Sequence, residues 1–444
     1  MSSTDAGPAG DGADPGRRRR AMLVAAFGTV VEWYDFTLYL YLAPTLAIVF
    51  FGGDTNSLIW TFGVFAAAYL MRPVGALVFG QIGDRVGRRQ SLIASAVLMS
   101  IAMLLTAALP GASSIGWVAG ALMLLLRCLM GFSVGGEFSG ILVYLLERSR
   151  DHNRGYVTSW ACANSEIGAL LAVGASSVLS VTLSPADLQS WGWRVAFVLG
   201  GVLAAIMLVL RHGLDESPVF ERLRRDGKLP HTPVLDVLRT QRTAVLIAFA
   251  ITSLSAVTYY LNITFVSTYL TDFVHTPTAT ALGLSTLAAV VVLVVTPFAG
   301  ALSDRMGRRS LTIALAVLAA ISTPLLFALL GTGANGLVVT GALLLAAPAA
   351  AVTSIAASAI PEQFVAAGRF SAMAIGYNTA TAVFGGLSPL VATILIEVSG
   401  WKLAAAFYVT VIALLVLPVL WVMPETAGVR LHDTAEDRDA ATRT

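Results

Sequence analysis

Twelve long apolar segments, separated by short polar stretches, divide this sequence. A membrane-spanning helix needs about 20 mainly apolar residues, so each segment is long enough to cross a bilayer. Some are longer than about 25 residues, which favours tilted spans or spans that extend beyond the membrane. The sequence therefore predicts an all-α membrane protein. Its twelve spans are expected at 22–50, 58–79, 91–110, 116–147, 155–182, 193–211, 243–271, 279–302, 310–331, 336–360, 369–397 and 401–423.

The positions of Lys and Arg between these segments predict the orientation, because cytoplasmic loops carry an excess of both residues. With the N-terminus inside, 24 of the 28 basic residues fall in the inner loops and tails. Arg194 and Lys402 fall outside, and Arg72 and Arg127 lie within spans. We therefore expect both termini in the cytoplasm and a multi-pass protein of the inner, cytoplasmic membrane.

Composition excludes a large soluble enzyme: 57% of the residues are hydrophobic and 12% are charged, against about 25% charged residues in soluble domains. A net charge of +2 gives no reason to expect nucleic acid. Cys128 and Cys162 both fall in apolar segments, so no disulfide is expected. No Walker motif, metal-ligand cluster or histidine near the middle of a span is present. We therefore expect no enzyme activity, no cofactor and no metal.

The segments form two groups of six, joined by a charged, amphipathic stretch that we expect to form cytoplasmic surface helices. The same motif occurs in both groups, as "GQIGDRVGRRQSL" at 80–92 and "GALSDRMGRRSL" at 300–311. Such a repeat indicates two similar bundles around one site in the middle of the membrane. The expected parts are a disordered basic tail (1–20), a first bundle (21–211), a linker (212–242), a second bundle (243–423) and a cytoplasmic tail (424–444).

Several motifs resemble the major facilitator superfamily, and within it the metabolite:proton symporter family of citrate, α-ketoglutarate, shikimate and proline/betaine carriers. They are "EWYDFTLY", "MRPVGALVFGQIGDRVGRR", "RCLMGFSVGGEFSG", "RGYVTSW", "WGWRVAFVLGG" and "YNTATAVFGGLSP". The resemblance covers essentially residues 20–425 and implies a carrier whose cavity is lined by spans one, four, seven and ten. The sequence departs from the family where a glutamine is usual, at Met130 and at Ala161 or Cys162.

Glu32 and Asp35 are two carboxylates on one face of the first span, about ten to thirteen residues into it and near mid-bilayer. An unpaired charge there costs about 2.5–3.5 kcal/mol or more, so each group needs a partner or a function. We expect Asp35 to pair with Arg127 of span four, and protonation of Asp35 to release Arg127 for a substrate carboxylate. The alternative is a static pair that fixes helix packing. Arg72 is expected to be structural.

Other polar residues within spans are further candidates. Glu137 in span four is a second proton site or a gate residue, and Glu166 in span five is a cavity acid or a partner for a neighbouring helix. Spans one, seven and eleven add polar side chains suited to an oxygen-rich solute. We expect substrate contacts from Tyr39, Tyr259, Tyr260, Asn262, Tyr377 and Asn378.

The repeated motif also implies, through the family resemblance, a gate at the cytoplasmic side. Asp84 and Asp304 would cap helix N-termini or pair with arginines across the interface between the bundles, and Glu147 could complete the arrangement. The plainer interpretation is that the basic residues only anchor the topology. The expected gate residues are Asp84, Arg85, Arg88, Arg89, Arg148, Asp304, Arg305, Arg308 and Arg309.

These features predict a carrier that imports a small organic acid, of the di- or tricarboxylate type, together with protons by alternating access. We expect it to function as a monomer in the lipid bilayer, with the acid and protons as its partners. The first alternative is uptake of a zwitterion such as proline or a betaine, which also carries a carboxylate. Proton-driven drug efflux and a non-transporting sensor are the remaining alternatives.

Overall fold

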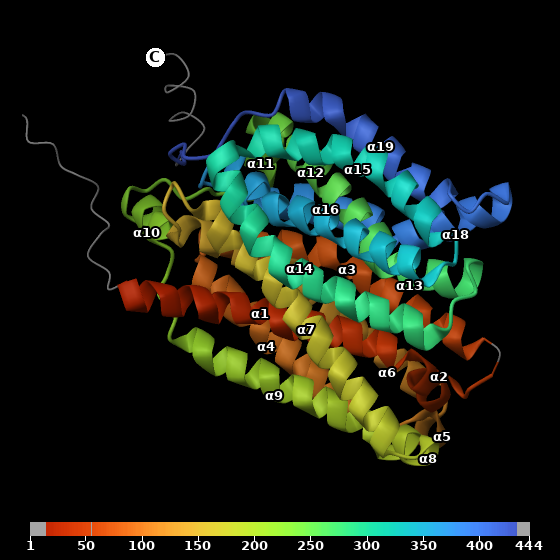
Figure 1. Ribbon diagram of the computed structural model, residues 1–444. Helices are drawn as coiled ribbons and strands as arrows, with labels where there is room; N and C mark the ends of the chain where they lie inside the picture. The colour runs from red at the N-terminus through yellow and green to blue at the C-terminus, as the bar shows by residue number, and fades with distance from the viewer. Residues whose placement is uncertain (1–14, 55, 433–444) are drawn as a thin grey trace, which may run out of the picture.

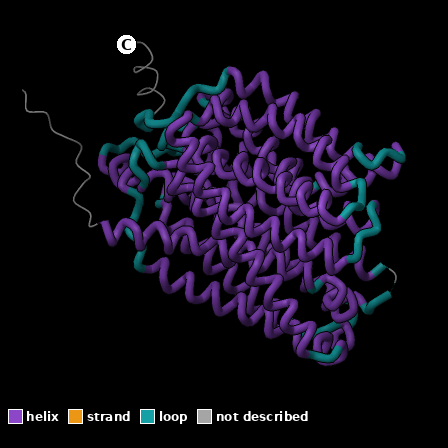
Figure 2. Tube along the Cα trace, viewed as in Figure 1, coloured by secondary structure: helices purple, strands orange, loops and turns teal. Residues whose placement is uncertain are grey.

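A computed structural model of the protein describes residues 15–54 and 56–432. These residues form helices that run side by side, joined by turns and short loops (Figures 1 and 2). Within these residues every regular element is helical, as expected for an all-α membrane protein. Eleven helical segments are long and apolar enough to cross a membrane. Helices α1 and α2, bent by 70° at their junction, supply a twelfth span if they are taken together.

The N-terminal half contains the first six spans, and the linker follows it. Its elements are α1 (Pro15–Tyr41), α2 (Ala43–Phe51), α3 (Ser57–Arg85), α4 (Arg88–Ala108), α5 (Ala112–Ile115), α6 (Val118–Arg148), α7 (Arg154–Thr182), α8 (Pro185–Asp187), the π-helix η1 (Leu188–Gly192) and α9 (Trp193–His212). The linker forms two short helices, α10 (Pro218–Arg225) and α11 (Pro233–Thr240).

The C-terminal half repeats this arrangement, with π-helical turns inside two of its spans. Its elements are α12 (Arg242–Tyr259), η2 (Tyr260–Thr264), α13 (Phe265–Thr268), η3 (Tyr269–Phe273), α14 (Thr278–Met306), α15 (Arg308–Leu330), α16 (Asn335–Glu362), α17 (Arg369–Ala380), η4 (Thr381–Gly386), α18 (Ser388–Ser399) and α19 (Ala404–Trp421).

The two halves meet along matching pairs of helices. Helix α7 of the first half packs along α14 of the second (Figure 1). Helix α3 packs along α17. The turns at Arg85–Arg89 and Arg305–Arg309 lie at the same end of the bundle, with the linker helices (left in Figure 1). We call this the basic end; α2, α8 and α18 lie at the opposite end.

Glycine shapes the two sharp turns of the repeated motif. Gly87 between α3 and α4 has φ +140°, and Gly307 between α14 and α15 has φ +93°, a region that L side chains rarely adopt. A β-carbon at Gly87 would also collide with the Glu216 carboxylate, and one at Gly307 with the Glu425 carboxylate. The repeat in the sequence thus corresponds to a repeat in backbone geometry.

Two expected boundaries change in the structure. The first span, expected to be continuous over 22–50, is broken near Leu42. Helix α1 begins at Pro15, so residues 15–20 are helical although we expected them to be disordered. Residues 1–14 of that expected tail, and 433–444 of the expected C-terminal tail, lie outside the described residues.

Candidate functional site

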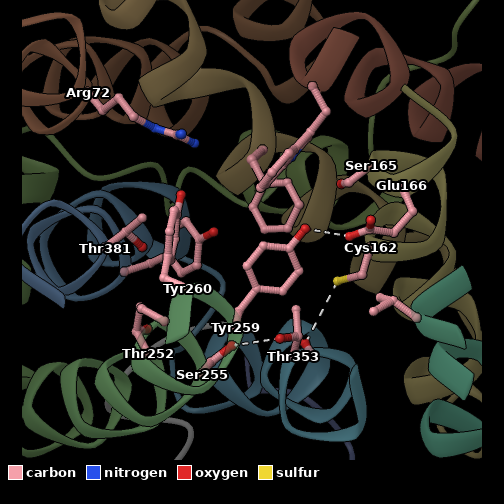
Figure 3. A pocket seen from close by; sticks show the side chains of 15 residues that line it. Arg72, Cys162, Ser165, Glu166, Thr252, Ser255, Tyr259, Tyr260, Thr353 and Thr381 are labelled. Carbon is pink, nitrogen blue, oxygen red and sulfur yellow. Dashed lines mark hydrogen bonds between the residues drawn. The ribbon is translucent and has the colours of Figure 1, made fainter. Parts of the chain in front are cut away.

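A cavity lies between the two halves, at about the middle of helices α3 and α7. Both halves contribute side chains, and most of the polar ones are uncharged (Figure 3). Arg72 and Glu166 are the two charged residues in its lining. The lining residues are Trp33, Arg72, Phe138, Cys162, Ser165, Glu166, Thr252, Ser255, Ala256, Tyr259, Tyr260, Val292, Thr353, Tyr377 and Thr381.

Helix α12 presents one polar face to this cavity. Thr252, Ser255 and Tyr259 follow one another at three- and four-residue spacing, which places them on the same side of the helix. The Tyr259 hydroxyl donates a 2.6 Å hydrogen bond to Glu166 of α7, across the interface between the halves (Figure 3). Among the described residues, no Arg or Lys is in ion-pair contact with Glu166. Glu166 is therefore a buried carboxyl whose partner is neutral.

Arg72 lines the cavity from α3 and is held by Glu32 of α1. The Arg72 guanidinium is 2.9 Å from the Glu32 carboxylate, and both side chains are buried. The guanidinium also lies 5.5 Å from the Phe36 ring centre and 5.3 Å from that of Tyr69, which is cation–π distance. We expected Arg72 to be only structural, but helix α3 packs along α6 with Arg72 in the lining of the cavity.

The expected pair of Asp35 and Arg127 is formed. Arg127 donates a 2.6 Å hydrogen bond to Asp35, and a second one of 3.2 Å to Thr106. The Tyr39 ring lies 5.4 Å from the guanidinium. Neither Asp35 nor Arg127 is among the lining residues, however, and both are buried inside the N-terminal half. The cation that faces the cavity is thus Arg72, which is the partner of Glu32.

Glu137 forms a third buried ion pair in the N-terminal half. Arg211, at the end of α9, donates to both Glu137 carboxylate oxygens, and Ser95 of α4 donates a further hydrogen bond of 2.6 Å. Arg211 also donates to the Leu92 carbonyl at 2.7 Å. Glu137 has no exposed surface and does not line the cavity.

The remaining expected substrate residues divide into two groups. Tyr259, Tyr260 and Tyr377 line the cavity, with the Tyr260 hydroxyl 2.5 Å from that of Tyr69 in the other half. Tyr39, Asn262 and Asn378 are buried elsewhere and do not line it. Tyr39 donates to the Thr61 carbonyl at 3.0 Å, and Asn262 donates to Thr323 at 3.1 Å.

Several lining residues were missed from the sequence. The polar spacing within α12 could have indicated Thr252 and Ser255, because it continues the face that carries Tyr259. Cys162 lies four residues before Glu166, and Thr381 lies four residues after Tyr377, so helical spacing could have indicated these two as well. Trp33, Ser165 and Thr353 have no such spacing to an expected site residue.

At the basic end, the two repeated aspartates each cap a helix of the opposite half. Asp84 accepts hydrogen bonds of 3.3 and 2.8 Å from the backbone N–H groups of Phe370 and Ser371, at the start of α17. Asp304 accepts bonds of 2.9 Å from Gly155 and Tyr156, at the start of α7. A carboxylate is favourable at a helix N-terminus because the exposed N–H groups there carry partial positive charge.

Two buried glutamates, one in each half, each contact one arginine of their own half and one of the other half. Glu147 at the end of α6 lies 3.3 Å from Arg88 and 2.9 Å from Arg369 of the other half. Glu362 at the end of α16 lies 3.1 Å from Arg308 and 4.0 Å from Arg154 of the other half. These contacts join the halves at the basic end. We call the set the latch: Asp84, Arg88, Glu147, Arg154, Asp304, Arg308, Glu362 and Arg369.

A second pair of glutamates accepts hydrogen bonds from the two turns of the repeated motif, at Arg85–Arg89 and Arg305–Arg309. Glu216 accepts from the Arg89 backbone N–H at 3.1 Å, and Glu425 accepts from the Arg308 and Arg309 N–H groups at 2.7 and 3.1 Å. Burial raises the pKa of Glu216 above its ordinary value, although the N–H groups of Ser217 and Arg89 act in the opposite direction. Each half therefore holds its motif turn with a carboxylate that follows its last span.

The expected gate residues are only partly in the latch. Asp84, Arg88, Asp304 and Arg308 belong to it. The Arg89 and Arg309 side chains instead donate to carbonyls at the ends of their own halves, His212 and Trp421 respectively. Arg148 donates to the Glu216 carbonyl at 2.9 Å. Arg85 and Arg305 are exposed and stand outside the latch, contrary to our expectation. Glu362, Arg154 and Arg369 were not in the expected set.

Two similar six-span halves, one cavity between them and a latch at one end define a membrane carrier rather than an enzyme. Residues 21–229 match the family of sugar (and other) transporters, and residues 247–442 match the Major Facilitator Superfamily. The chain belongs to the major facilitator superfamily and is a secondary transporter.

Curated relatives cover nearly the whole chain. It is 36% identical to the α-ketoglutarate permease of Escherichia coli K12, over 94% of this chain and 96% of that one. It is 32% identical to the proline/betaine transporter of the same strain, over 94% of this chain and 85% of the relative. It is 31% identical to the citrate-proton symporter of Klebsiella pneumoniae, over 90% of each.

Solved structures share the fold at low identity. A proton:xylose symporter of the superfamily, bound to 6-bromo-6-deoxy-D-glucose, superimposes with a TM-score of 0.79 at 18% identity, over 96% of this chain and 100% of that one. The human organic anion transporter MFSD10 gives a TM-score of 0.68 at 17% identity, over 92% of this chain and 100% of that one. The expected twelve-span, two-bundle fold is thereby confirmed.

Proposed function

We propose that this protein imports a small carboxylate-bearing solute together with one or more protons, by alternating access through a single chain. The basic end would face the cytoplasm of the cell that carries the protein in its inner membrane. The observation that carries the proposal is that Arg72, the cation in the cavity lining, is held by an ionisable partner, Glu32.

Coupling follows from competition for Arg72. When Glu32 is ionised, it neutralises the guanidinium; when it is protonated, the guanidinium needs another anion, because an unpaired charge is costly inside the membrane. A substrate carboxylate suits the planar guanidinium as a replacement. Proton and substrate would then favour each other's binding, as linkage requires. We assign this role to Glu32 and Arg72 rather than to Asp35 and Arg127, because only the former pair has a member that lines the cavity.

A small organic acid is the first substrate class. With Glu32 and Glu166 both protonated, Arg72 would be the remaining charge in this region of the cavity, which favours an anion. The relatives named for α-ketoglutarate and citrate are consistent with this class.

A zwitterion is the second class, and a different part of the cavity favours it. Trp33, Tyr259 and Tyr260 bring aromatic rings close together, with centres 5.7 Å apart for both Trp33–Tyr259 and Tyr259–Tyr260. Aromatic faces beside the ionised Glu166 would suit an ammonium or quaternary ammonium group, while Arg72 held the carboxylate. The relatives named for proline and betaine are consistent with it.

Alternating access would operate through the latch. Its reciprocal caps and ion pairs join the halves at the basic end, so in this conformation the cavity would be separated from the cytoplasm. Opening toward the cytoplasm would require the caps on α7 and α17 to break together. Both halves of the cavity come from one chain, which supports a monomeric transport unit.

The test is to reconstitute the purified protein in liposomes with an imposed proton gradient. Labelled α-ketoglutarate, citrate, proline and glycine betaine are offered separately, with a pH-sensitive dye inside the vesicles. We expect accumulation of at least one solute and an internal acidification that depends on that solute. Solute accumulation that is unaffected when the proton gradient is collapsed would refute proton coupling, and no movement of any of the four would refute the proposed substrate classes.

A further inference from the structure

We infer that Glu137 relays the coupled proton from Glu32 to the basic end, through the interior of the N-terminal half and apart from the path of the substrate. The inference rests on the proposed proton coupling, and it adds an exit for the proton that does not pass through the cavity. It gives a function to a buried carboxyl that substrate binding leaves unused.

The geometry that carries this inference is centred on Gly28 of α1. Gly28 lies one helical turn before Glu32, on the same face and closer to the basic end. A β-carbon at Gly28 would collide with Arg211 Nη2 and with Glu137 Oε1. The pair formed by Glu137 and Arg211 therefore lies directly against α1, one turn below Glu32, in space that only a glycine leaves free.

Glu32 also has a free oxygen for a transfer. Its Oε1 binds Arg72, whereas its Oε2 is buried without a hydrogen-bond partner among the described residues. Glu32 and Glu137 are both buried, and Glu137 lies against α1 one turn from Glu32, a spacing that a bridging water molecule would span for proton transfer.

The surroundings of Glu137 lead toward the basic end. Ser95, which donates to it, lies seven residues after the start of α4 at Arg88, or about 10 Å along the helix. Arg211 reaches Glu137 from the last turn of α9, and the next residue, His212, is exposed at the basic end. The groups that face the two carboxyls are Arg72 from α3, Ser95 from α4, Arg211 from α9 and Tyr377 from α17.

The transfer conserves proton and charge. Protonated Glu32 gives its proton to ionised Glu137, so Glu32 becomes a carboxylate again and rebinds Arg72. The substrate carboxylate on Arg72 is thereby displaced. Arg211 keeps its charge throughout and retains its bond to the Leu92 carbonyl while Glu137 is neutral. Glu137 then releases the proton to water that enters beside α4 from the basic end when the carrier opens there, and the pair with Arg211 forms again.

The experiment compares two modes of transport by the full-length protein in liposomes. Exchange of labelled for unlabelled solute does not need the carrier to lose its proton, whereas net uptake driven by a proton gradient does. α-Ketoglutarate and glycine betaine serve as the two probes. The variant Glu137→Gln/Arg211→Gln removes both charges together, so that no unpaired ion is left in the membrane. Glu397→Gln, at an exposed carboxyl of α18, is the matched control.

We expect the double variant to exchange at a rate within twofold of the wild type, while its net uptake and its internal acidification fall at least tenfold. Ser95→Ala keeps both charges and should slow net uptake about threefold with unchanged exchange, which supplies a test if the double variant does not fold. The inference is overturned if variants that exchange normally also take up solute and protons at the wild-type rate. It is also overturned if exchange falls as much as net uptake. Absence of acidification in the wild type would instead refute the proposed function.

Discussion

The two halves share one fold but differ in what they bury. The N-terminal half contains three ion pairs within its spans, Glu32–Arg72, Asp35–Arg127 and Glu137–Arg211. In the described residues of the C-terminal half, ion pairs occur only at the basic end, and the core carries neutral groups such as Asn262, Thr323 and Tyr259.

This difference suggests a division of labour. Charges inside the membrane are expensive and are kept mainly where they have a function. The N-terminal half would handle the proton and the substrate carboxylate, while the C-terminal half offers a neutral polar surface that closes over the solute. The latch, by contrast, is nearly symmetric, because the caps and ion pairs from both halves must break together when the basic end opens.

The largest expected effect is at Arg72. Arg72→Gln removes the cavity cation and leaves Glu32 without its partner, so we expect proton-driven uptake to fall at least about 100-fold. Removing one member of a buried pair also costs about 3–5 kcal/mol of stability, which the double variant Glu32→Gln/Arg72→Gln should largely restore without restoring uptake. Initial uptake rates in liposomes and thermal unfolding in detergent measure the two effects. Uptake by Arg72→Gln at more than a tenth of the wild-type rate would contradict this role.

The latch should give the next largest effect, and it tests the symmetry of the halves. Asp84→Asn and Asp304→Asn each weaken one reciprocal cap, worth about 1 kcal/mol, so we expect similar losses of transport of about five- to tenfold. In a Cys128→Ser background, Cys162 in the cavity should also react faster with a thiol reagent added at the basic end. Exposed Arg305→Gln is the control. A clear effect of one aspartate alone would show that the caps are not equivalent.

Glu166 offers a smaller effect that separates the two substrate classes. If the cavity binds a zwitterion, Glu166→Gln should weaken its binding about fivefold, equal to about 1 kcal/mol, because the cationic group loses its carboxylate. Binding of an organic acid should be unchanged or stronger. Competition of unlabelled α-ketoglutarate and glycine betaine against the transported solute measures both affinities, with Tyr259→Phe as the control that keeps the carboxylate. Equal losses for both solutes would mean that Glu166 does not choose between the classes.

The smallest effect is expected for the pair formed by Asp35 and Arg127. Asp35→Asn/Arg127→Gln keeps neutral hydrogen-bonding groups in place, so uptake and proton coupling should stay within about threefold of the wild type. Solute-dependent acidification of liposomes is the measurement, beside the matched variant Glu32→Gln/Arg72→Gln. If the Asp35 and Arg127 variant loses coupling and the Glu32 and Arg72 variant does not, Asp35 and Arg127 are the proton-coupling pair, as predicted from the sequence.

The sequence predicted the spans, the two halves and the pairing of Asp35 with Arg127. Counting residues along a span gives the depth of a side chain, and both arginines lie deep in their helices. It does not give the direction in which the side chain points. That direction depends on packing between distant segments. For example, Gly131 and Gly135 allow helix α6 to pack against the backbone of α3 at Ala68 and Arg72. The choice between Arg72 and Arg127 therefore required the structure.

The latch shows a similar limit. The repeated motif identified Asp84 and Asp304, because both lie in the same short pattern. Their partners at the starts of α17 and α7 lie far away in the sequence, in segments with a different motif. The pattern also treated all three basic residues of each motif alike, although one arginine of each motif is buried in the latch and Arg85 and Arg305 are exposed.

The linker has a consequence for how the protein could be assembled. Phe220 of α10 lies 5.3 Å from the Arg88 guanidinium of the first half, while the Gln241 side chain, just after α11, accepts from the Val365 N–H of the second. Helix α10 packs on α6 of the first half, whereas α11 contacts both α3 and α17, so it bridges the halves. Residues 227–232 connect these two helices. Two separately synthesised fragments, divided within that stretch, should find each other in the membrane and restore a complete carrier.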